Sequence, residues 1–181
     1  MSKEFRCLIP LDDAKSIVLS HIPDAKAEIV PLEKAWNRIL AEKIVSNLDV
    51  PNFDRASMDG YAVRSEDIVA CREDIPVSLK LTGFAPMGML PSIQIRQGEA
   101  AEVSTGSMMP NGADSVVMIE YAEAKGDQVY IHRPVHYGEN VQSRSSDISI
   151  GETVLFPSTR LGAREIGVLA AIGREKVKVR C

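Results

Sequence analysis

Residues 51–63 read PNFDRASMDGYAV and combine a proline stop, two aspartates and an Asp-Gly pair within thirteen residues. Pro51 interrupts the extended segment before it, because proline has no backbone N–H to donate. Gly60 can adopt a positive φ and Asp59 can bond to nearby backbone, so the pair predicts a tight turn. An alternating segment begins at Tyr61, which indicates a short strand. Taken by itself, this stretch predicts a surface turn that carries a solvated carboxylate.

The strand pattern continues through the middle of the sequence. Residues 77–82 alternate apolar and polar side chains, and residues 115–119 form a nearly continuous apolar run. Residues 129–131 resume a strand after the turn residues at 125–127. Proline and glycine punctuate the spaces between these segments. Together, the patterns predict a β-rich region over about residues 49–141.

Helical patterns lie on both sides of this β-rich region. Residues 11–22 and 31–40 place apolar side chains three and four positions apart, and Pro31 is tolerated as a first helical residue. Residues 163–172 show a third such stripe that ends at Gly173, a typical helix stop.

These segments predict an α+β fold with two subdomains. Residues 1–48 and 142–181 are expected to form a small α/β subdomain, and residues 49–141 a β-rich subdomain inserted into it. The patterns alone do not distinguish an insertion from one continuous domain. A chain of 181 residues is long enough to bury about 70% of its unfolded surface.

Composition excludes several classes of protein. The net charge is −4 and no cluster of lysines or arginines stands out, so we expect no nucleic-acid partner. Cys7, Cys71 and Cys181 are too widely spaced to indicate a zinc site or a disulfide framework. The N-terminal residues contain no apolar run of the length of a signal peptide or a membrane span. We therefore expect a cytoplasmic protein with no membrane partner.

Two further motifs follow the opening stretch. Residues 104–117 read STGSMMPNGADSVV, a Thr-Gly turn that leads into a PxGADxVV pattern and a strand. Residues 138–151 contain Gly-x-Asn-Val and then Asp-Ile-x-x-Gly. Together with SMDGYAV at residues 57–63, these ordered motifs resemble the MoeA family, the molybdopterin molybdenumtransferases. The resemblance extends over residues 11–180.

The resemblance implies a fold and an activity. Members of the family have an elongated N-terminal portion with irregular, bent β-sheets and a β-rich subdomain inserted into a small α/β subdomain. They insert molybdate into adenylylated molybdopterin and release AMP with the help of Mg²⁺. Their pterin-binding domain follows the region that this sequence matches and is absent from it, so we expect the chain alone to be inactive. The implied partners are a molybdopterin-binding domain, of the same protein or of another chain, and a second copy in a homodimer.

The resemblance also implies site residues. The implied catalytic residues are Asp59, Thr105 and Asp147, and the implied cofactor-binding residues are Ser57, Gly106 and Arg144. Asp59 is also the residue that would orient Mg²⁺. Four of these residues have a purely structural alternative: Thr105-Gly106 as a strand-end turn, Asp147 as an exposed turn aspartate, and Arg144 as a solvated cation.

One segment departs from the family pattern. Residues 142–146 read QSRSS, where the family usually has an arginine followed by Gly-Glu before the aspartate. The resemblance therefore does not extend to the geometry of this loop, and Arg144 is the residue that could supply the basic charge. The alternative function is a non-catalytic module for dimerisation or docking onto a molybdenum-cofactor protein, in which the motifs serve folding and interface formation.

Overall fold

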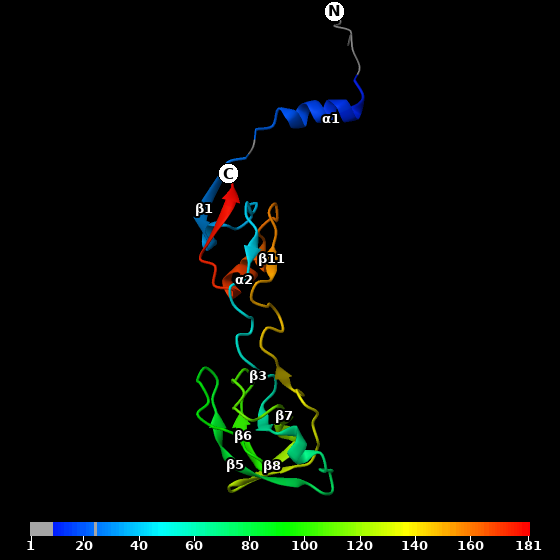
Figure 1. The fold of residues 1–181 in the computed structure, drawn as a ribbon, viewed down its shortest axis with the longest axis vertical. Helices are drawn as coiled ribbons and strands as arrows, with labels where there is room; N and C mark the ends of the chain where they lie inside the picture. Colours follow the sequence, from blue (N-terminus) through cyan, green and yellow to red (C-terminus); the bar gives the residue numbers. More distant parts are fainter. Residues whose placement is uncertain (1–8, 24) are drawn as a thin grey trace, which may run out of the picture. The chain divides into compact units, whose positions relative to one another are not determined.

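The structure is a computed structural model that describes residues 9–23 and 25–181. The chain folds into two compact units (Figure 1). Unit 1 contains the described residues up to Lys43 together with Leu155–Cys181, and unit 2 contains Ile44–Val154. The described residues form two α-helices and four sheets, which confirms the α+β class. The narrower limits of 49–141 for the inserted region remain a prediction, and Cys7 lies outside the described residues.

Unit 1 combines two helices with a two-stranded sheet. Its elements are α1 (Leu11–Ser20), β1 (Ala27–Pro31), the 3₁₀ helix η1 (Leu32–Lys34), α2 (Ala163–Ala171) and β12 (Lys176–Arg180). β1 and β12 pair antiparallel. The helices predicted at 11–22 and 163–172 are confirmed as α1 and α2. At the start of α2 the Gly162 N–H donates to Glu165 Oε2 at 3.0 Å, and Gly173 follows its end with a φ of 72°. No helix in the described part of the chain has the length and apolarity needed to cross a membrane.

The α-helix predicted for residues 31–40 is wrong. Only η1 forms there, since Asn37 takes a φ of 65° and leaves the helical conformation. The backbone N–H of Leu40 then donates to the Thr159 carbonyl at 2.8 Å rather than to a carbonyl four residues back. Leu40 is fully buried, whereas Trp36 is 60% exposed. The apolar spacing is therefore satisfied by an irregular segment that is held by distant backbone, and not by one face of a helix.

Unit 2 is built on a six-stranded sheet with the strand order β7-β4-β6-β5-β9-β8. Its strands are β4 (Gly60–Val63), β5 (Val77–Ala85), β6 (Glu99–Val103), β7 (Ser115–Met118), β8 (Ala122–Lys125) and β9 (Gln128–Ile131). The sheet curls, and all neighbours are antiparallel except β5 and β6 (Figure 1). The strands predicted at 77–82, 115–119 and 129–131 are confirmed.

Short elements complete unit 2. They are the 3₁₀ helices η2 (Ser65–Ile68) and η3 (Ile119–Tyr121) and the strand pairs β3 (Arg55–Ala56) with β10 (Val141–Gln142) and β2 (Ile44–Val45) with β11 (Thr153–Leu155). β11 reaches Leu155, where the chain passes into unit 1.

β4 is a fully buried strand of the six-stranded sheet. All four of its residues are buried, and it pairs with β6 on one side and β7 on the other. Gly60 has a φ of 155°, and a Cβ at this position would lie 1.9 Å from the Val117 carbonyl oxygen. No other residue type fits there without a shift of backbone, so the glycine of the Asp-Gly pair is a requirement of the fold.

Candidate functional site

The three sequence motifs meet at β3, within unit 2. The Gly106 N–H donates to the Ala56 carbonyl at 2.8 Å, and the Ala56 N–H donates to the Ser107 carbonyl at 2.9 Å. On the opposite edge, the Ser57 N–H donates to the Asn140 carbonyl at 2.9 Å. The motifs around residues 57, 105 and 140 are thus joined through backbone hydrogen bonds to one short strand.

Asp59 and Thr105 are in direct contact. Asp59 Oδ1 accepts the Thr105 backbone N–H at 2.6 Å and the Thr105 hydroxyl at 3.0 Å. These two bonds, the backbone one first, hold the pKa of the Asp59 carboxyl below its ordinary value of 3.8. Asp59 therefore carries a full negative charge at neutral pH. Because both residues are exposed, this charge faces solvent and is available to a ligand.

The turn that carries Thr105 is itself fixed in place. Gly106 has a φ of 85°, which favours glycine, and a Cβ there would lie 3.2 Å from Met87 Sδ. The side chain of Met87 is 67% exposed beside this turn. Gly106 thus has a structural role in shaping the turn, and its predicted contact with a cofactor stays a prediction.

Asp147 has a separate set of partners. Gln142 Nε2 lies 3.2 Å from Asp147 Oδ1 and 3.3 Å from Oδ2, and the Ser146 hydroxyl lies 3.2 Å from Oδ1. The Asp147 backbone N–H donates to the Val50 carbonyl at 2.9 Å. Within residues 9–23 and 25–181, Asp59 and Asp147 have no hydrogen-bonding partner in common. They belong to opposite edges of β3, and a joint catalytic role for them stays a prediction.

Arg144 interacts with two aspartates of unit 2. Its guanidinium contacts Asp49 Oδ2 through Nε at 2.7 Å and Nη2 at 2.6 Å, and its backbone N–H donates to Asp54 Oδ1 at 2.7 Å. The pKa of Asp49 is lowered by the Ile150 backbone N–H first and by Arg144 second. Part of the cationic charge of Arg144 is therefore balanced by Asp49, and its predicted role as an anion contact stays a prediction.

A Mg²⁺ ion bound at Asp59 would need several further oxygen ligands. Among the described residues there is no group of three or more His, Cys, Asp or Glu side chains that could hold an ion. Asp59 supplies a single carboxylate, one oxygen of which is already occupied by Thr105. Since Mg²⁺ needs about six oxygen ligands, the residues described here do not form a magnesium site by themselves.

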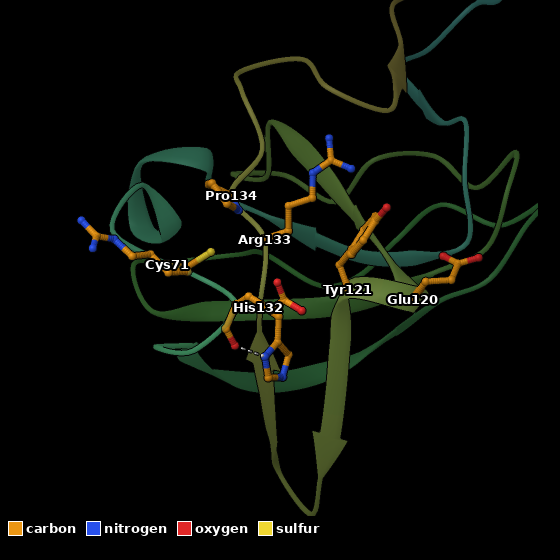
Figure 2. Close-up of a pocket in the computed structure, with 8 residues that line it drawn as sticks. Cys71, Glu120, Tyr121, His132, Arg133 and Pro134 are labelled. Carbon is orange, nitrogen blue, oxygen red and sulfur yellow. Dashed lines mark hydrogen bonds between the residues drawn. The ribbon is translucent and has the colours of Figure 1, made fainter.

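A separate hollow of about 630 Å³ lies elsewhere in unit 2 (Figure 2). The Arg133 guanidinium lies 4.8 Å from the centroid of the Tyr121 ring, and His132 Nδ1 lies 3.2 Å from the Glu73 carbonyl oxygen. The remaining lining residues include two glutamates and a second arginine, so positive and negative groups balance. None of the six predicted site residues lines this hollow.

Sequence reasoning missed two residues beside the predicted site. Arg55 Nε donates to Gln142 Oε1 at 2.8 Å, and this connects β3 to the partner of Asp147. The sequence marks Gln142 only as part of a departure from a family pattern. The signal that identifies the pair is the register of β3 on β10, which places Gln142 opposite Arg55. That register joins residues 87 positions apart and is not readable from local sequence.

Comparisons with known proteins agree with these motifs. A family model described as the MoeA N-terminal region (domain I and II) matches residues 9–173. A molybdopterin molybdenumtransferase from Nostoc sp. is 37% identical over 171 residues, which are 92% of this chain and 39% of that protein. One from Staphylococcus aureus is 33% identical and covers 99% of this chain and 43% of its own length.

A solved structure of a related protein has the same fold over most of this chain. The crystal structure of a molybdopterin biosynthesis MoeA protein from Pyrococcus horikoshii matches with a TM-score of 0.90 and 38% identity, over 96% of this chain and 46% of that one. The chain therefore spans less than half the length of each of these proteins.

Proposed function

Because the chain belongs to the MoeA N-terminal region family, we propose that it is the part of a molybdopterin molybdenumtransferase that supplies Asp59, Thr105 and Asp147 to the transfer reaction. The reaction is the insertion of molybdate into adenylylated molybdopterin with release of AMP. The observation that carries this proposal is the carboxylate of Asp59, which two donors of Thr105 hold in one orientation while it remains exposed.

The electrostatics of Asp59 favour one of two chemical roles. A carboxylate could accept a proton as molybdate loses an oxygen, or it could orient a cation beside the oxyanion. The lowered pKa of Asp59 makes it a weak base at neutral pH, which argues for the orienting role. A bare carboxylate would repel molybdate, so this role requires a positive charge between the two anions.

Mg²⁺ is the cation that the family resemblance implies. Asp59 Oδ2 accepts no hydrogen bond from the described residues and is the oxygen that could face a hydrated ion. The other oxygen ligands would have to come from substrate, water or another part of the protein, as is usual for Mg²⁺ at phosphate-containing substrates.

The proposal is tested with Asp59→Asn in the full-length polypeptide. Asparagine keeps an oxygen that can accept both bonds from Thr105, so the turn is preserved while the charge is lost. We expect molybdenum insertion to fall at least tenfold. Asp127→Asn, which removes a charge from the turn between β8 and β9, is the matched control and should retain full activity. Equal activity of the two variants would remove Asp59 from the mechanism.

A second candidate function, docking or dimerisation, is favoured by α1. None of its residues is buried, and its apolar stripe includes Leu11 at 83%, Ile17 at 51% and Val18 at 62% exposure. We infer that this stripe packs on a second copy in a homodimer, in line with the family resemblance. Light scattering of the full-length polypeptide would test this: Ile17→Glu should give a monomer, whereas Ser16→Glu should leave the dimer intact. A monomeric unmodified protein would refute it.

The remaining expectations belong to the same proposal. A molybdopterin-binding domain, from the same protein or a partner chain, would complete the site, because the chain covers less than half of its relatives. The cytoplasm is the compartment in which we place the reaction.

A further inference from the structure

Gln142 links the half-buried Arg55 of β3 to the exposed carboxylate of Asp147. Its side-chain oxygen accepts from Arg55 Nε at 2.8 Å, and its side-chain nitrogen lies 3.2 and 3.3 Å from the two oxygens of Asp147. Arg55 and Gln142 are both half-buried, whereas Asp147 is exposed. The amide therefore connects a partly shielded cation to a carboxylate at the surface.

The chemistry of the two neighbours fixes the orientation of the Gln142 amide. A guanidinium has only donors, so the atom that faces Arg55 must be the amide oxygen. An ionised carboxylate has only acceptors, so the atom that faces Asp147 must be the amide nitrogen. Reversing the amide would break both contacts at once. The side chain thus has one state, and that state presents N–H groups to Asp147.

The loop backbone is held independently of this side chain. The Asp147 N–H donates to Val50, the Ser145 N–H donates to Pro51 at 2.9 Å, and Arg144 is anchored on Asp49. The fold of residues 143–147 therefore does not need the Gln142 amide. What the amide adds is the direction of the Asp147 carboxylate, which at an exposed position would otherwise exchange between rotamers.

We propose that Gln142, held by Arg55, is a positioning residue that orients the Asp147 carboxylate for the transfer reaction. This inference rests on the proposed function and deepens it. Arg55 also polarises the amide, since its charge on the carbonyl oxygen strengthens the N–H donors on the other side. The Ser146 hydroxyl, 3.2 Å from both Gln142 Nε2 and Asp147 Oδ1, closes the same small network.

The test is Gln142→Glu in the full-length polypeptide. Glutamate keeps an acceptor for Arg55 but turns a second carboxylate toward Asp147, so the direction of Asp147 is lost while the packing is kept. We expect kcat to fall about 10- to 100-fold, the range seen when an outer partner of a functional group is removed, with KM within about twofold. Gln128→Glu, on β9 with an oxygen that accepts from the Ser78 hydroxyl, is the matched control and should be unchanged.

Two further measurements make the outcome decisive. If Gln142 acts through Asp147, Gln142→Glu should cause no additional loss of kcat in an Asp147→Ala background, and full additivity would overturn the proposal. In addition, the side-chain ¹H–¹⁵N amide signals of Gln142 should shift on Asp147→Ala and not on Asp127→Ala. If the unmodified protein shows no transfer, the proposed function fails, and unmoved amide signals would separately refute the Gln142 network.

Discussion

Replacing Gly60 by alanine should destabilise the protein more than the loss of any single surface contact would. The added Cβ would lie 1.9 Å from the Val117 carbonyl oxygen and 3.0 Å from the Ile119 nitrogen, which are both backbone atoms that cannot rotate away. A φ of 155° adds backbone strain of about 1–3 kcal/mol for a residue with a side chain. Overpacking against fixed neighbours adds about 1–3 kcal/mol more. The expected loss in the free energy of unfolding is therefore about 2–6 kcal/mol.

The control is Gly126→Ala, in the turn between β8 and β9. Gly126 also has a positive φ, of 64°, but a Cβ there meets nothing within 4 Å. Alanine should cost only the left-handed conformation, about 1–2 kcal/mol. Urea denaturation should show a lower midpoint for Gly60→Ala at unchanged slope, and a thermal midpoint about 6–12 °C below that of the control for a difference of about 3 kcal/mol. Equal midpoints for the two variants would show that β4 and β7 can separate, and would refute the argument from close approach.

Two further predictions concern the carboxylates. Thr105→Val removes one of the two donors to Asp59, so the pKa of Asp59 should rise toward its ordinary value in a ¹³C NMR titration, and Thr105→Ser should restore it. Since the folded pKa of Asp59 lies below the unfolded one, its stabilising effect is present above about pH 4 and is lost as the pH falls through the folded pKa, so Thr105→Val should also reduce acid sensitivity. Arg144→Gln should raise the pKa of Asp49 only in part, because the larger cause of its lowering is a backbone N–H that the variant retains. A return to the ordinary pKa would contradict this ranking of causes.

The strands of unit 2 could be predicted because their signals are local. Alternation at residues 77–82 and the Gly-containing turn before residue 128 depend only on neighbouring positions, and the structure confirms both. The helix prediction for residues 31–40 was wrong for the opposite reason. Its apolar spacing is compatible with a helix, but the backbone partner of Leu40 is Thr159, far along the chain. Periodicity reports which side chains are buried, and here burial is achieved without a helix.

The same limit applies to the candidate site. The motif residues Asp59, Thr105 and Asp147 could be selected by resemblance, but their partners could not. The contact between Thr105 and Asp59 joins residues 46 positions apart, and the contact by which Arg55 holds Gln142 joins residues 87 positions apart. The sequence shows that Gln142 departs from the family motif, but only the register of β3 on β10 shows that it contacts Arg55.

The two residues of the Asp-Gly pair at positions 59–60 are explained by different requirements. Gly60 is demanded by the fold, so its presence in a motif says nothing about chemistry. Asp59 has a structural task as well, since its oxygen satisfies the Thr105 N–H and hydroxyl. That task needs an acceptor but no charge, and asparagine would fulfil it equally. If Asp59→Asn folds normally and loses activity, the charge itself is what the reaction uses; if it folds normally and remains active, the whole pair is explained by folding.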